Sequence, residues 1–159
     1  GPGPGSRPVI INLLIGCAML IVNLGIQVWA VGLMVGHLRR RSARGHPGSG
    51  FPMLGGALLL LLLGHFLQFA TWALLFRLLG EFADFETALY HSIVNFTSLG
   101  YGDLVMSERW RLLGALEAAN GVLMFGLTAG LLLSVFNVLL RQRPAVDALL
   151  HPPGGEQDA

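Results

Sequence analysis

Three long apolar runs constrain this chain most, because each is long enough to cross a lipid bilayer. They cover residues 9–36, 53–79 and 112–140. A helix rises about 1.5 Å per residue, so about 20 apolar residues span a hydrocarbon core of about 30 Å. Only 12% of the 159 residues are charged, against about 25% in an average soluble domain. We therefore expect an all-α membrane protein with three transmembrane helices.

The first run, 9–36, carries small and polar residues on one helical face. Such a stripe is typical of a face packed on other helices, and we favour that interpretation over a polar pathway. Its members are Asn12, Gly16, Asn23, Gln27 and Ala30. In the second run, Gly64, Gln68 and Thr71 predict a similar contact face, and His65 is expected to be a hydrogen-bonded interior residue rather than a ligand.

The two ends of the chain and the stretch between the first two runs are expected to lie outside the bilayer. Residues 37–52 are basic and rich in Gly and Pro, which predicts a cytoplasmic loop that also serves as an interfacial anchor. Residues 1–8 predict a disordered start, interpreted as a cloning remnant, a clipped precursor or a fragment. Residues 141–159 predict a disordered cytoplasmic tail.

A fourth apolar segment is too short to cross the membrane. At about 1.5 Å per residue, residues 87–97 reach only about 17 Å. A segment that enters the bilayer without crossing it must be re-entrant, and non-helical backbone at that depth must be buried in protein or line a water-filled path. We expect a helix over 86–97, capped near Asp84, followed by such a backbone segment.

That backbone segment resembles the selectivity filter of tetrameric potassium channels. It reads Thr97, Ser98, Leu99, Gly100, Tyr101, Gly102 and Asp103. Its surroundings are similar too, since Gly121 and Gly126 in the third run resemble the glycines of an inner helix with a hinge. The resemblance covers residues 53–140 and leaves the first run outside, as in bacterial three-helix members of the pore-only ion channel family.

The resemblance implies a pore domain over 53–140. It contains an outer helix (53–79), a pore helix (86–97), a filter (97–103) and an inner helix (112–140). The family filter conducts K⁺ passively by replacing its hydration shell with backbone carbonyls. The implied K⁺ ligands are the carbonyls of Ser98, Leu99, Gly100 and Tyr101 with the Ser98 hydroxyl, and Thr97 and Gly102 complete the filter.

The resemblance also implies the partners and the location. One chain supplies one filter strand, so a ring of four carbonyls requires a homotetramer in the cell membrane. K⁺ is the transported ion, and the contacts are with lipid and other copies of the chain. We expect no nucleic acid, no large ligand-gating domain and no voltage sensor. We also expect no enzymatic activity, because the chain shows no nucleophile–base pair, metal-ligand spacing or phosphate loop.

Several residues around the filter are candidates for supporting or gating it. Asp103, His91 and Asn95 are expected to brace the filter, and His91 is either a packing residue or a proton sensor. Glu117 is a carboxyl inside a transmembrane run, which is a functional hypothesis by default. It either faces the pore helix or pairs with an arginine at the outer interface. Gly121 is the expected gating hinge, with Gly126 as an alternative.

Two departures from the usual filter leave alternatives open. Ser98 and Leu99 stand where Thr and Val are usual, which allows a weakly selective cation channel. A non-conducting membrane scaffold is a further alternative, and a transporter subunit is disfavoured because it would carry four pore loops. The filter mouth is expected outside with the N-terminus, because six arginines (39, 40, 41, 44, 141, 143) then lie inside and four (7, 77, 109, 111) outside.

Overall fold

The computed structural model describes residues 6–43 and 50–141, and all of their regular structure is helical. The helices are α1 (Ser6–Ala43), α2 (Gly50–Leu78), α3 (Phe85–Phe96) and α4 (Arg111–Arg141). Three of them contain stretches long and apolar enough to cross a membrane, namely Val9–Arg40, Leu54–Leu78 and Arg111–Asn137. The prediction of an all-α membrane protein with three spanning helices is confirmed.

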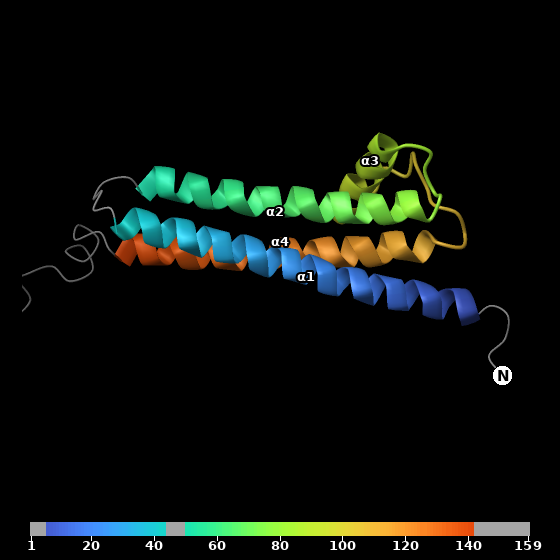
Figure 1. Cartoon of the computed structure of the whole chain (residues 1–159), viewed down its shortest axis with the longest axis horizontal. Helices are drawn as coiled ribbons and strands as arrows, with labels where there is room; N and C mark the ends of the chain where they lie inside the picture. The colour runs from blue at the N-terminus through green and yellow to red at the C-terminus, as the bar shows by residue number, and fades with distance from the viewer. Residues whose placement is uncertain (1–5, 44–49, 142–159) are drawn as a thin grey trace, which may run out of the picture.

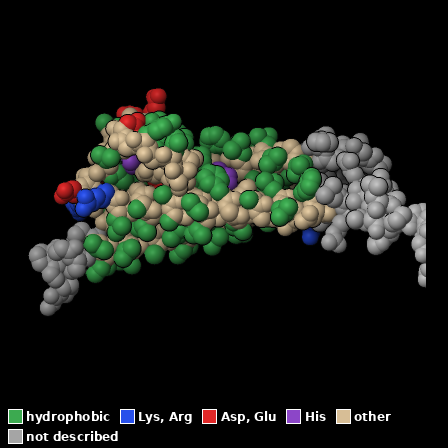
Figure 2. Space-filling view, turned by 180° about the vertical axis from the view of Figure 1, so that it is seen from behind, with side chains coloured by type: hydrophobic (Ala, Val, Ile, Leu, Met, Phe, Trp, Pro, Cys, Tyr) green, Lys and Arg blue, Asp and Glu red, His purple; other side chains and the backbone are tan. Residues whose placement is uncertain are grey.

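The three long helices lie side by side, and the short helix α3 sits at one end of the bundle beside α2 and α4 (Figure 1). Helix α1 begins at the same end as α3, so the N-terminal end of the chain and the loop after α3 share one side of the bundle. Apolar side chains cover the long sides, while charged side chains gather at the ends (Figure 2). This distribution fits a bundle whose middle faces lipid or other helices.

The expected loop at 37–52 is shorter than the sequence suggested. Helix α1 continues to Ala43 and α2 begins at Gly50. Arginine, leucine and alanine sustain a helix, and the cluster of helix breakers begins only at Gly45. Pro52 is tolerated because it lies in the first turn of α2. The rest of the predicted loop, 44–49, lies outside the described residues.

The chain ends show a similar difference. Helix α1 begins at Ser6 rather than at residue 9, with Pro8 in its first turn, where a missing N–H costs nothing. Residues 1–5 and 142–159, where disorder was predicted, lie outside the described residues. The bounds of α3 and α4 differ from the expected ones by a single residue at each end.

A single apolar cluster joins α2, α3 and α4 at the end where α3 lies. Its centre contains Trp72 and Phe76 from α2, Phe96 from α3 and Leu113 from α4, all fully buried. Phe69 and Phe96 meet edge to face with ring centroids 5.0 Å apart. This packing fixes the C-terminal end of α3, and with it the start of the loop that follows.

Helix α1 packs through the polar stripe that the sequence predicted. Its five members (Asn12, Gly16, Asn23, Gln27 and Ala30) are all buried in the described structure. Across from them, Gly64 lies so close to Ala30 that a Cβ on it would come within 2.9 Å of the Ala30 Cβ. Both predicted contact faces are therefore confirmed, and small residues allow the close approach.

Candidate functional site

Helix α3 begins with a side-chain cap, as predicted. The Asp84 carboxylate accepts hydrogen bonds from the Thr87 N–H and the Thr87 hydroxyl, both at 2.8 Å. The bond from the Thr87 N–H lowers the pKa of Asp84, so this carboxylate stays charged. A negative charge at a helix N-terminus stabilises the helix, whose opposite end is partially negative.

Helix α3 ends in a tight turn that a serine closes. The Leu99 N–H donates to the Val94 carbonyl at 3.0 Å, and the Ser98 N–H donates to the Asn95 carbonyl at 2.8 Å. This is the Schellman pattern of hydrogen bonds, in which a left-handed residue, usually glycine, follows the helix. Ser98 takes that position with φ +57°.

The backbone after α3 alternates in handedness. Positive φ values occur at Ser98 (+57°), Gly100 (+60°) and Gly102 (+74°), and Leu99 and Tyr101 between them are not in this region. Glycine adopts this conformation at little cost, whereas a serine there is uncommon. Within a single chain the side chains of Leu99 and Tyr101 are exposed. Left-handed and other residues therefore alternate regularly along this loop, unlike in an ordinary turn.

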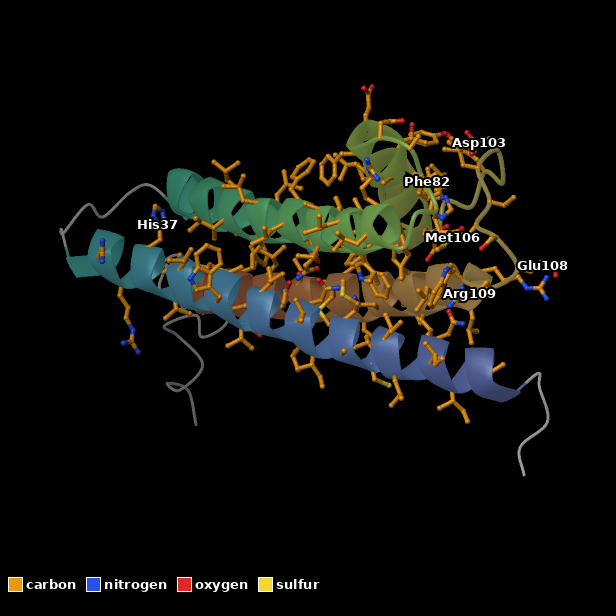
Figure 3. All side chains as sticks on the ribbon, turned by 45° about the vertical axis from the view of Figure 1, so that its right-hand side comes forward. His37, Phe82, Asp103, Met106, Glu108 and Arg109 are labelled. Carbon is orange, nitrogen blue, oxygen red and sulfur yellow. The ribbon has the colours of Figure 1, made fainter. Side chains whose placement is uncertain are left out.

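Three hydrogen bonds tie this loop and the residues after it to the segment before it. The Tyr90 hydroxyl donates to the Asp103 carboxylate at 2.8 Å, and this bond raises the pKa of Tyr90. Further along, the Glu81 carboxylate accepts from the Ser107 N–H and hydroxyl, each at 2.7 Å. Below Asp103, Phe82 and Met106 join the apolar cluster (Figure 3). The sequence suggested a bond behind the filter from Asp103 but missed the Glu81–Ser107 pair, which no spacing rule signals.

His91 is buried between two aromatic rings and faces the loop. Its ring lies 5.6 Å from that of Phe76 and 4.8 Å from that of Phe82. The Asn95 Nδ2 atom lies 2.8 Å from His91 Nε2, and because the amide nitrogen can only donate, Nε2 must accept. His91 also bonds to the Leu104 backbone, yet burial lowers its pKa. His91 and Asn95 therefore link α3 to the residue after Asp103.

Glu117 is fully buried and faces α3. The Ser92 hydroxyl lies 2.5 Å from Glu117 Oε1 and 2.9 Å from the Phe69 carbonyl of α2. The Asn95 amide lies beside the same carboxyl. Of the two positions that the sequence left open for Glu117, the structure has the one against the pore-helix segment. Its other oxygen, Oε2, and both polar atoms of Asn120 have no hydrogen-bond partner among the described residues.

Residues 57–137 match the protein family described as "Ion channel". The match covers 81 of the 159 residues. The chain belongs to this ion channel family. No curated protein and no solved structure matches the chain. The matched residues include most of α2 and α4 and all of α3 with its loop, whereas α1 lies outside them. The chain is thus a membrane protein of an ion channel family, which points to a passive channel rather than an enzyme.

The two glycines expected to bend the fourth helix of this channel differ in their surroundings. A Cβ on Gly121 would fall on the carbonyl oxygen of Phe96, the last residue of α3. Gly126 has nothing within 4 Å of such a Cβ, and neither has Gly130. Gly121 is therefore where α4 touches the end of α3, whereas Gly126 lies beside open space.

Proposed function

We propose that this chain is one subunit of a homotetrameric, potassium-selective channel with residues 97–103 as its filter. In this proposal, K⁺ crosses passively and binds to the carbonyl oxygens of Ser98, Leu99, Gly100 and Tyr101. The four filter segments, one from each chain, surround one axis, and lipid surrounds the tetramer. The channel lies in the cell membrane with the N-terminus and the filter mouth outside and the C-terminus inside.

The alternating φ values at Ser98, Gly100 and Gly102 carry this proposal. Extended backbone points successive carbonyls to opposite sides. Alternation between left- and right-handed conformations lets successive carbonyls face the same side, which is the arrangement that a dehydrated cation needs. Glycines at every second position supply this pattern at low cost. A side-chain-lined pore would need no such backbone.

The electrostatics around the loop also favour a cation. The C-terminal end of α3 carries a partial negative charge of about half an electron and lies next to the start of the loop. Asp84, Glu81 and Asp103 cluster at the α3 end of the bundle, each held by a hydrogen bond to its neighbours. Fixed carboxylates at a pore mouth raise the local cation concentration.

Potassium flux into liposomes of the purified protein tests the conducting function. Gly100→Ala is the variant designed to disrupt the filter backbone. A Cβ there would meet no atom within 4 Å, but residue 100 must keep a φ of +60°, which strains a residue with a side chain. We expect the wild type to conduct and Gly100→Ala to lose flux. Gly25→Ala, in open space on α1, is the control that should conduct normally. Absent wild-type flux would favour the scaffold alternative.

Selectivity and assembly need separate measurements. A bi-ionic reversal potential near the K⁺ equilibrium potential supports a potassium channel, whereas a value near zero supports the weakly selective alternative. Native mass in detergent should equal four chains. Any other stoichiometry contradicts the filter arrangement, because one chain supplies only one strand.

A further inference from the structure

Four side chains from three helices form a closed hydrogen-bonded ring inside the bundle. Gln27 of α1 donates from Nε2 to the Thr128 hydroxyl of α4 at 2.9 Å. His65 of α2 joins Thr128 through Nε2 at 3.1 Å and Gln68 through Nδ1 at 3.2 Å. Gln68 Nε2 closes the ring on Gln27 Oε1 at 2.9 Å. We call these four residues the polar ring.

One contact with a residue outside the polar ring determines which group donates and which accepts in every bond of the ring. Gln68 Nε2 also donates to the Asn23 carbonyl at 3.3 Å, which fixes the orientation of the Gln68 amide. Gln68 Oε1 must then accept from His65 Nδ1, so His65 Nε2 accepts the Thr128 hydroxyl. Each member thus donates once and accepts once around the ring. Such chains strengthen one another where the dielectric constant is low.

Three members of the polar ring are shielded from water and lipid, and Thr128 is half-buried. Gln27 and Gln68 are fully buried and His65 nearly so. The His65 ring also contacts Phe125, next to Gly126, with centroids 4.7 Å apart. A polar side chain that loses its partner inside a membrane protein stays unpaired, so helices joined in this way resist separation.

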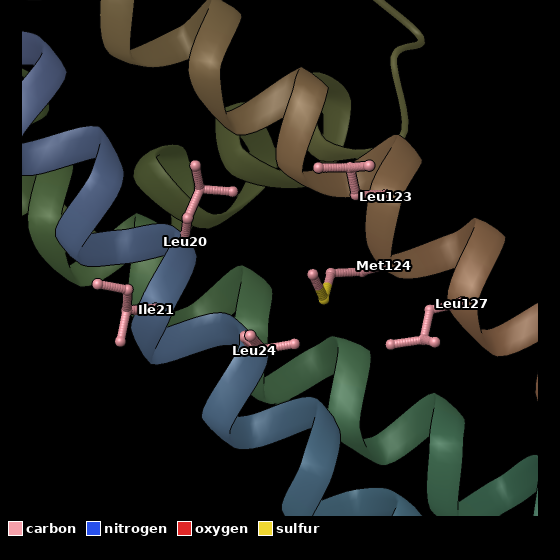
Figure 4. A pocket seen from close by; sticks show the side chains of 6 residues that line it. All are labelled: Leu20, Ile21, Leu24, Leu123, Met124 and Leu127. Atoms are coloured by element: carbon pink, nitrogen blue, oxygen red, sulfur yellow. The ribbon is translucent and has the colours of Figure 1, made fainter.

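Thr128 lies beyond both glycines that are candidates for bending α4. It follows Gly126 by two residues and Gly121 by seven, while Glu117 holds the preceding part of α4 to Ser92. Beside the ring, an apolar groove of about 370 Å³ separates α1 from α4 (Figure 4). It is lined by Leu20, Ile21, Leu24, Leu123, Met124 and Leu127. Past the groove, Leu132 and Val135 of α4 pack against an apolar cluster that includes Met34 of α1, and the Gln27–Thr128 bond is a polar contact between the two helices next to it.

We infer that the polar ring holds the C-terminal half of α4 against α1 and thereby restrains opening of the channel. We call this restraint the latch. The inference rests on the proposed function, in which α4 lines the pore and bends at a glycine. A bend there shifts Thr128 relative to Gln27 and His65, which lie on other helices, and so disrupts both bonds. Helix α1, outside the matched family region, thereby becomes a built-in regulator of the pore.

Thr128→Val tests the latch, because it removes both bonds and preserves the shape of the side chain. Membrane hydrogen bonds average about 0.6 kcal/mol each, so losing two should shift the open–closed equilibrium about sevenfold toward the open state. Single-channel recording measures this shift as a rise in open probability at unchanged K⁺/Na⁺ selectivity. Gln27→Leu, which removes one of the two bonds to Thr128, should raise open probability less.

Ser134→Ala is the matched control on the same part of α4. Its hydroxyl bonds only to the Gly130 carbonyl of its own helix, at 2.9 Å, so open probability should not change. An open probability for Thr128→Val and Gln27→Leu equal to that of Ser134→Ala overturns the latch. If Thr128→Val fails to assemble, Gln27→Leu alone decides. Absent wild-type conductance would instead contradict the proposed function.

Discussion

Helix α4 is held by two polar sites that differ in how completely their groups are paired. At the Glu117 site, one carboxyl oxygen and the whole Asn120 amide lack partners among the described residues, although both residues are fully buried. In the polar ring of Gln27, His65, Gln68 and Thr128, every member both donates and accepts. Completely paired networks specify helix packing, whereas unpaired buried groups concentrate where a structure serves another purpose.

The two sites also connect α4 to different partners. Glu117 reaches α3, directly behind the alternating loop, and stays within the family-matched region. Thr128 reaches α1, which lies outside that region. Gly121 and Gly126 stand between the two sites. The N-terminal part of α4 is thus bonded to α3, which precedes the alternating loop. A more C-terminal part of α4 is bonded to α1.

Replacing Gly121 should have the largest effect, because Gly121 is the point where α4 touches α3. In Gly121→Ala the new Cβ would fall on the Phe96 carbonyl oxygen, and backbone cannot rotate away as a side chain can. We expect a loss of about 3 kcal/mol or more in the free energy of unfolding. Thermal unfolding in detergent measures the loss.

Gly126→Ala is the matched control for that variant. Its Cβ meets nothing within 4 Å, and alanine favours a helix over glycine by about 1 kcal/mol. We expect unchanged or slightly higher stability and, if α4 bends at this position, a lower open probability. Equal thermal stability of the two alanine variants would show that Gly121 is free to act as a hinge and is not required for packing.

A second pair of variants tests whether the Glu117 site and the polar ring differ in purpose. Gln68→Leu leaves His65 Nδ1 on α2 and Gln27 Oε1 on α1 without these partners and should cost about 2 kcal/mol of stability. Glu117→Leu leaves the Ser92 hydroxyl, which still has the Phe69 carbonyl as an acceptor, and the Asn95 amide, which still has His91 Nε2. It should therefore cost less than about 1 kcal/mol. Thermal unfolding of both variants makes the comparison.

The functional part of the Glu117 carboxyl is tested by a variant that preserves its shape. Glu117→Gln keeps an acceptor for Ser92 and the shape of the side chain, so a change in its currents reports on the carboxyl itself. We expect altered open probability or K⁺/Na⁺ selectivity in Glu117→Gln at near wild-type stability. Unchanged currents would reduce Glu117 to a packing residue.

Periodicity in the sequence found the helix faces but not their partners. The spacing of Gln27 and Gln68 identified both as buried contact residues, and His65 was expected to be hydrogen-bonded inside the bundle, as it is. Thr128 escaped notice, because a hydroxyl among small residues has no distinctive spacing. Which three helices meet at one point depends on their rotation about their axes, and packing of the whole bundle sets that rotation.

The same limit applies at the filter segment. Length alone predicted that α3 cannot cross the membrane, and Asp84 marked its start. The left-handed Ser98 could not be predicted, because serine rarely closes a Schellman turn and only the path of the following backbone requires it. The side of α4 that Glu117 faces was equally open, since both an arginine and Ser92 were within reach along the chain.

Protonation of His91 should have the smallest effect on stability of the changes considered. It tests whether the packing behind the alternating loop responds to protons. Burial between Phe76 and Phe82 lowers the pKa of His91, with Asp103 and Glu81 opposing in part. The unfolded chain therefore binds this proton more readily, and the stability that neutral His91 contributes is present above about pH 6.5 and is lost as pH falls further. We expect thermal stability to drop more between pH 7.5 and 5.5 in the wild type than in His91→Gln, which keeps every other histidine. Equal drops would mean that His91 is only a packing residue.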